Sequence, residues 1–107
     1  FRIIFNLIEN ASKYGKRILV EVIRIDNNLI INIEDDGPGV PDKFRKKIFR
    51  PFFKIDNSRN LNEQGSGLGL SIANELVKKL NGNIIITASK KLKGSCFTIK
   101  IQDLQFL

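Results

Sequence analysis

The chain has 107 residues, of which 42% are hydrophobic and 27% charged; this predicts one soluble, packed α/β or α+β domain and excludes a disordered tail, a fibrous repeat and a multidomain enzyme. It contains no histidine and a single cysteine, which excludes imidazole catalysis, Ser-His-Asp triads, histidine-ligated metals, internal disulfides and cysteine-cluster zinc sites. Lys and Arg number 18 against 11 Asp and Glu, and the net charge of +7 favours an anionic partner: nucleic acid, acidic lipid, nucleotide phosphate or acidic protein.

The first predicted element is a helix over residues 1–14. Its apolar residues fall at helical spacing, and Gly15 follows as a stop; they are Phe1, Ile4, Phe5, Ile8 and Ala11. The same helix carries a polar stripe made of Asn6, Asn10, Lys13 and Tyr14. This stripe is unusual, because a buried carboxamide must find hydrogen-bond partners.

An antiparallel hairpin is predicted next, with strands over residues 17–25 and 29–35 and a turn at 26–28. Alternation in the second strand puts Asp35 on the core face with Ile31 and Ile33, and Glu34 and Asp36 on the other. The run Asp36-Gly37-Pro38-Gly39 then ends the strand.

The second half of the chain predicts four further features. A short basic helix covers 41–49, and the polar, aperiodic stretch 52–65 has the length of a functional loop, which we interpret as a lid. The glycine run 65–70 leads into an amphipathic helix capped by Gly82. A second hairpin pairs 83–89 with 95–101, in which Cys96 is a small structural residue opposite Phe97.

Three clusters are able to carry chemistry, and each has a structural alternative. Glycines at a helix start expose backbone N–H groups that bind phosphate, or they form a hinge. A core-facing Asp35 needs a donor such as the exocyclic amine of adenine, or it caps the following turn. Asn10 offers a neutral oxygen to a magnesium ion that bridges nucleotide phosphates, or it bonds to backbone.

The order of these clusters resembles the Bergerat-type (GHKL) ATP-binding catalytic domain of sensor histidine kinases, over nearly the whole chain. Residues 6–11 are similar to its N box, Asp35-x-Gly37-x-Gly39 to G1, residues 49–53 to the F box, and Gly65-x-Gly67-x-Gly69 to G2. The amino-acid sequence at residues 13–15 and 34–39 is especially similar to that of osmosensor-type kinases.

The resemblance implies a role for each matching residue. Asn10 would ligate Mg²⁺, Lys13 and Arg59 would approach the phosphates of ATP, Tyr14 would pack on adenine, and Asp35 would accept from its amine. Residues 52–66 would form the ATP lid. The implied ATP-binding set is Asn6, Asn10, Lys13, Tyr14, Asp35, Gly37, Gly39, Lys54, Ile55, Arg59, Gly65, Ser66, Gly67, Leu68, Gly69 and Leu70.

The implied fold is an α/β (α+β) sandwich with a mixed, mostly antiparallel sheet covered on one face by three helices. Residues 1–107 would form one catalytic domain that lacks the family's first strand and the start of its first helix, which leaves an exposed sheet edge. The absence of methionine likewise predicts a segment cut from a longer protein.

The implied reaction is transfer of the γ-phosphate of ATP to a histidine. This chain would supply no catalytic residue beyond the nucleotide site, because the acceptor histidine would lie upstream on a dimerisation domain. A response regulator would then receive the phosphate. We expect a cytoplasmic domain of a homodimeric parent anchored in the inner membrane, although no run here approaches the roughly 20 apolar residues of a membrane span.

Two other functions remain open. Hydrolases of the same superfamily carry a general-base Glu one turn before the magnesium Asn, but that position is Asn6, and Glu9 points about 100° away around the helix. A basic binding module for nucleic acid or acidic protein lacks interleaved aromatic residues, so we expect no nucleic-acid partner. The chain could also be a degenerate kinase domain that no longer binds nucleotide, but the retained motifs argue against this interpretation.

Overall fold

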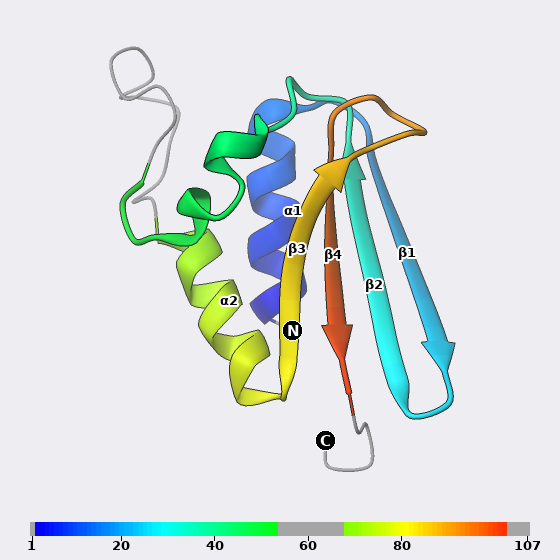
Figure 1. Ribbon diagram of the computed structural model, residues 1–107. Coiled ribbons are helices and arrows are strands. Elements are labelled where there is room, and N and C mark those ends of the chain that lie inside the picture. The colour runs from blue at the N-terminus through cyan, green and yellow to red at the C-terminus, as the bar shows by residue number, and fades with distance from the viewer. Residues whose placement is uncertain (1, 54–67, 103–107) are drawn as a thin grey trace.

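The computed structural model describes residues 2–53 and 68–102 and shows a sheet with helices packed on one of its faces (Figure 1). The elements in chain order are α1 (Arg2–Tyr14), β1 (Ile18–Ile25), β2 (Asn28–Asp35), the 3-10 helices η1 (Asp42–Phe44) and η2 (Lys47–Phe49), α2 (Gly69–Lys79), β3 (Gly82–Ala88) and β4 (Ser95–Ile101). Neighbouring strands run antiparallel in the order β1-β2-β4-β3. The predicted fold class is confirmed.

The core lies between the two central strands and the helices. Alternate residues of β2 and β4 point to the helical side and are buried, among them Ile31, Ile33, Phe97 and Ile99. From the other side α1 contributes Ile3, Leu7 and Ala11, whose spacing of four residues keeps them on one face, and α2 contributes Ala73 and Val77. Truncating a side chain as buried as Phe97 to alanine costs about 3–5 kcal/mol.

The segment after β2 differs from the single short helix expected over 41–49. It forms two 3-10 helices, in which the amides of Arg45 and Arg50 donate to carbonyls three residues earlier, at 3.2 and 2.9 Å. The break between them lets Ile48 enter the core and lets the Phe49 ring meet Phe97 edge to face, with ring centroids 6.5 Å apart. Packing of these apolar side chains therefore overrides the continuous helix.

The end of α2 also differs from the prediction that Gly82 caps it. Asn81 adopts the left-handed conformation that ends the helix, with φ of 60°, and Gly82 is the first residue of β3. A side chain at position 82 would collide with the Lys100 carbonyl and come within 2.9 Å of Val77. Glycine is needed there for close packing on β4.

The remaining features concern the edge and outer face of the sheet. β1 is an outer strand of the described sheet, and its Val22 and Ile25 are exposed. Cys96 is buried on the face of β4 away from the helices, and this burial raises the pKa of its thiol, in agreement with a structural role. None of the helices in the described ranges is long and apolar enough to cross a membrane.

Candidate functional site

Asp35 is the last residue of β2, and only 3% of the residue is exposed. Its Oδ1 atom accepts hydrogen bonds from the amides of Gly37, at 2.9 Å, and Ser95, at 3.2 Å. Within residues 2–53 and 68–102, Oδ2 accepts no hydrogen bond, yet no fully buried side-chain oxygen or nitrogen there lacks a partner. The small exposed area of Asp35 therefore includes Oδ2, so one carboxylate oxygen caps the turn while the other is left partly accessible.

Asp36 ties the same turn to the end of α1. Its Oδ1 atom accepts from the amides of Lys16 at 2.7 Å and Arg17 at 3.1 Å, and these bonds hold the pKa of the carboxyl below its ordinary value. A Cβ on Gly15 would lie 2.6 Å from this oxygen, so glycine is required for the approach. Sequence reasoning assigned Asp36 no role, although two adjacent carboxylates before a glycine turn were a visible signal.

The C-terminal end of α1 lies directly against the turn after β2 (Figure 1). A Cβ added to Gly37 would be 2.7 Å from the Tyr14 carbonyl and 3.0 Å from the Tyr14 Cβ. Tyr14 itself is 49% exposed. The structure thus places Tyr14 against Gly37, which lies 23 residues later in the sequence and follows Asp35 by two.

The polar stripe of α1 lies on one flank of the helix, while Ile4 and Ile8 on the opposite flank pack against the core. Asn6 and Asn10 are half-buried and Lys13 is exposed. Neither carboxamide forms a hydrogen bond to another described residue. The alternative that Asn10 bonds to backbone is therefore not seen in this part of the chain.

The start of α2 leaves backbone donors available. Leu68 precedes the helix without a side-chain cap, and its carbonyl accepts from the Ile72 amide and the Ser71 hydroxyl, both at 2.9 Å. The first amides of a helix have no intrahelical partner. A Cβ built on Gly69 meets no atom within 4 Å, so packing does not require glycine at this position.

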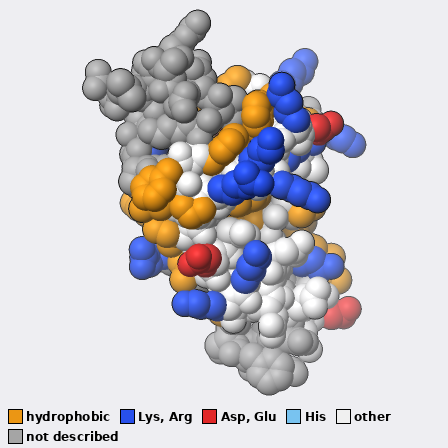
Figure 2. Space-filling view, turned by 60° about the vertical axis from the view of Figure 1, so that its left-hand side comes forward, with side chains coloured by type: hydrophobic (Ala, Val, Ile, Leu, Met, Phe, Trp, Pro, Cys, Tyr) orange, Lys and Arg blue, Asp and Glu red, His pale blue; other side chains and the backbone are white. Residues whose placement is uncertain are grey.

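Cations crowd the 3-10 segment beside the site. Figure 2 shows Lys and Arg side chains outnumbering the acidic ones on the face that carries α2 and this segment. The segment over residues 42–50 has one acidic residue, Asp42, and five basic ones: Lys43, Arg45, Lys46, Lys47 and Arg50. Asp42 pairs with Arg45 at 2.7 Å, and the others of the set form no ion pair to the described residues. The face has a positive potential that suits an anionic ligand.

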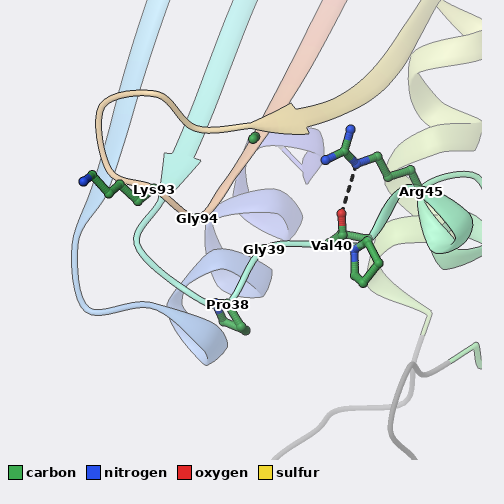
Figure 3. A pocket seen from close by; sticks show the side chains of 8 residues that line it. Pro38, Gly39, Val40, Arg45, Lys93 and Gly94 are labelled. Carbon is green, nitrogen blue, oxygen red and sulfur yellow. Dashed lines mark hydrogen bonds between the residues drawn. The ribbon is translucent and has the colours of Figure 1, made fainter.

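A pocket of about 280 Å³ opens beside the loop that follows Asp35 (Figure 3). Gly39, Val40, Arg45, Lys93 and Gly94 are among its lining residues. Gly39 has φ of +80°, a conformation that favours glycine. Arg45 Nε donates to the Val40 carbonyl at 3.0 Å and so braces this loop. Sequence reasoning missed this role of Arg45.

Part of the predicted site lies outside the described residues. The proposed lid over 52–66 is described only at its first two positions, and Lys54, Ile55, Arg59, Gly65, Ser66 and Gly67 fall in the range 54–67. Their predicted roles stay predictions.

The described residues thus form a helix-covered antiparallel sheet with a buried carboxylate at the end of a central strand, beside a helix that carries two half-buried Asn residues. The chain belongs to the family of histidine kinase-, DNA gyrase B-, and HSP90-like ATPases, whose family model matches residues 1–105. Members of this family bind ATP, so ATP is the ligand of this domain.

Similar curated proteins include histidine kinases. Histidine protein kinase SaeS of Staphylococcus epidermidis is 34% identical over 98% of this chain and 31% of its own length. Sensor histidine kinase YcbM of Bacillus subtilis is 34% identical over 98% of this chain and 34% of its own. The chain thus spans about a third of the length of the curated relatives it matches.

Solved structures agree with this assignment. The mycobacterial sensor histidine kinase MprB superposes with a TM-score of 0.80 at 29% identity, over 94% of this chain and 68% of that chain. Full-length ShkA, solved in complex with AMPPNP, gives 0.76 at 27% identity, over 94% of this chain and 20% of that one.

Proposed function

We propose that residues 1–107 act as the ATP- and magnesium-binding catalytic domain of a two-component sensor histidine kinase. The observation that carries the proposal is the Asp35 carboxylate, buried and held through Oδ1 while Oδ2 is left for a ligand. The family membership and the kinase relatives support the same function.

This geometry supports a proposed mode of base recognition. Asp35 Oδ2 accepts a hydrogen bond from the exocyclic amine of adenine. Tyr14, a half-exposed residue whose carbonyl and Cβ adjoin Gly37, packs its ring on the base. Because Oδ1 is already fixed by two amides, little conformational freedom is lost when the nucleotide binds. A hydrogen bond to a charged group contributes about 1.5–3 kcal/mol.

The phosphates lie between α1 and the start of α2 in this proposal. Lys13 and the free amides of Gly69 and Leu70 contact phosphate oxygens, and the open space at Gly69 lets them approach. Leu68 and the glycines Gly37 and Gly39 shape the surrounding backbone. Lys54, Ile55 and Arg59 are predicted to contact the nucleotide from the lid over 52–66, and Gly65, Ser66 and Gly67 are predicted to do so from the glycine run at its end.

The residues present fit a magnesium ion. Asn10 is a half-buried neutral oxygen donor without a hydrogen bond to the described residues, and Asn6 stands one turn before it. Magnesium in nucleotide sites takes few protein ligands, so Asn10 would hold it, supported by Asn6. When bound, the ion neutralises charge on the phosphates during transfer.

The phosphate acceptor must lie on another domain, because this sequence has no histidine. A histidine nitrogen on a dimerisation domain of the same protein forms a bond to the γ-phosphorus as the bond to ADP breaks, and a response regulator then takes the phosphate. The parent protein is proposed to be a homodimer. Its catalytic domain works in the cytoplasm, where ATP is supplied, and the parent is anchored in the cell membrane.

Calorimetric titration with a non-hydrolysable ATP analogue, with and without Mg²⁺, tests the proposal. Asp35→Asn keeps the Oδ1 acceptor but turns a donor toward the adenine amine, so binding is expected to weaken at least tenfold. Asp26→Asn makes the same chemical change in the exposed hairpin turn and leaves binding unchanged. Asn10→Asp is expected to alter mainly the Mg²⁺ dependence.

Failure has a distinct signature. If a folded wild-type sample does not bind the analogue, or if Asp35→Asn binds as the wild type does, the proposed site is wrong. Tight, strongly salt-dependent binding of nucleic acid that ignores ATP would instead favour a basic binding module that uses the cationic face in Figure 2.

A further inference from the structure

The turn that joins β3 to β4 is a tightly bonded unit. The amide of Ser89 donates to the Gly94 carbonyl at 2.8 Å, and the amide of Lys93 donates to the Ser89 carbonyl at 2.9 Å. The Ser89 hydroxyl accepts from the Leu92 amide at 2.9 Å. Ser89 therefore takes part in each of these bonds through its backbone or its side chain.

The same hydroxyl reaches across to β2. It donates to Glu34 Oε1 at 2.8 Å, and both side chains are buried, with 6% of Glu34 and 3% of Ser89 exposed. A buried carboxylate is costly without a hydrogen bond, so this contact is strongly favoured. Since Glu34 lies on the sheet face away from the helices, the turn is fastened to β2 from that side.

The far end of the turn holds Asp35. The Gly94 amide donates to the Asp35 carbonyl at 3.0 Å, and the Ser95 amide donates to Asp35 Oδ1 at 3.2 Å. A Cβ on Gly94 would come within 2.5 Å of Asp35 Oδ1 and 2.6 Å of the Gly37 nitrogen. The close-up in Figure 3 shows Gly94 beside the loop that carries Pro38 and Gly39. The orientation of the Asp35 carboxylate thus depends on where this turn lies.

We infer that Glu34 and Ser89 are positioning residues for adenine recognition: their buried hydrogen bond fixes the turn at 89–94, and the turn aims Asp35 Oδ2 at the base. Neighbouring residues of a strand face opposite sides, so a single turn contacts Glu34 on one side of the sheet and Asp35 on the other. Neither Glu34 nor Ser89 touches the nucleotide. The inference rests on the proposed role of Asp35 in accepting from the adenine amine.

Base selectivity provides the test. ADP and inosine diphosphate share the sugar and phosphates, but the inosine base carries an oxygen where adenine carries its amine. Both affinities are measured by calorimetry with Mg²⁺ for the wild-type chain and for Ser89→Ala. We expect the wild type to prefer ADP by at least tenfold, and Ser89→Ala to lose roughly that factor for ADP with little change for inosine diphosphate.

Two further variants separate positioning from general loss of structure. Glu34→Gln keeps an oxygen that accepts from Ser89, so it is expected to retain the wild-type preference for ADP. Ser12→Ala removes an exposed hydroxyl that bonds the Glu9 carbonyl at 2.8 Å, and it is expected to change neither affinity. Thermal unfolding of each variant confirms that a folded chain was titrated.

The outcomes are distinguishable. A wild type that binds the two diphosphates equally refutes the role of Asp35 in adenine recognition, and the inference fails with it. A selective wild type whose preference is unchanged in Ser89→Ala, or whose two affinities fall by the same factor, refutes the positioning role alone. The positioning role is supported if Ser89→Ala loses affinity for ADP selectively while Glu34→Gln keeps the full wild-type preference for ADP.

Discussion

Replacing Gly69 by alanine is expected to raise stability and to weaken ATP binding together. Gly69 is the first residue of α2, its φ is not positive, and a Cβ there meets no atom within 4 Å. Alanine in a helix is favoured over glycine by roughly 0.5–1 kcal/mol, and a first-turn position takes the lower end of that range. For a domain of this size, about 0.5 kcal/mol corresponds to an increase in Tm of roughly 2–4 °C.

The binding effect has the opposite sign. If phosphate oxygens occupy the open space at Gly69, a methyl group there displaces them from the first amides of α2. The loss of one charge-assisted hydrogen bond, about 1.5–3 kcal/mol, weakens binding at least tenfold. Urea denaturation and calorimetry with the ATP analogue measure the two effects on the same sample.

A matched glycine serves as the control. Gly82→Ala places a methyl group against the Lys100 carbonyl and within 2.9 Å of Val77, so this variant is expected to lose stability. A destabilised Gly69→Ala would contradict the open space at α2. A stabilised Gly69→Ala with unchanged affinity would show that no phosphate lies at this position.

Three other outcomes are expected. Gly94→Ala crowds Asp35 Oδ1 and the Gly37 amide, so it should destabilise the fold by about 1–3 kcal/mol and weaken ATP binding; wild-type behaviour in denaturation and calorimetry would contradict this. The lowered pKa of Asp36 adds stability that is present above the ordinary pKa of 3.8 and is lost as pH falls through the pKa of the folded state. The urea midpoint should therefore fall less between pH 5 and 3 in Asp36→Asn than in the wild type, and an equal fall in the two proteins would refute this contribution of Asp36. Glu9 is exposed on α1, so Glu9→Gln should not change the Mg²⁺-dependent ATPase rate of the chain, whereas loss of that rate would favour the hydrolase alternative.

Local periodicity predicted the parts of the structure that depend on neighbours in sequence. Alternation in β2 placed Asp35 on the buried face, and helical spacing placed Asn6 and Asn10 on one flank of α1. The antiparallel hairpins followed from turn residues at 26–28 and 90–94. These features needed only the geometry of a strand or a helix.

Features set by contacts between distant segments were not predictable in this way. One of the two amides that fix the Asp35 carboxylate comes from Ser95, 60 residues later, and no local sequence pattern predicts that contact. The short helix expected over 41–49 became two 3-10 turns because Ile48 and Phe49 pack on the core. In both cases tertiary packing decided the outcome.

The two adjacent carboxylates at the end of β2 have a consequence for folding. Asp36 accepts from amides 19 and 20 residues earlier, and Asp35 accepts from an amide 60 residues later. Closing contacts of such separation is entropically costly and slow, so the site is complete only after β4 has paired with β2. In the proposed function ATP then binds only the finished fold, so bound nucleotide reports complete folding. It also stabilises the folded state, by an amount that grows with nucleotide concentration.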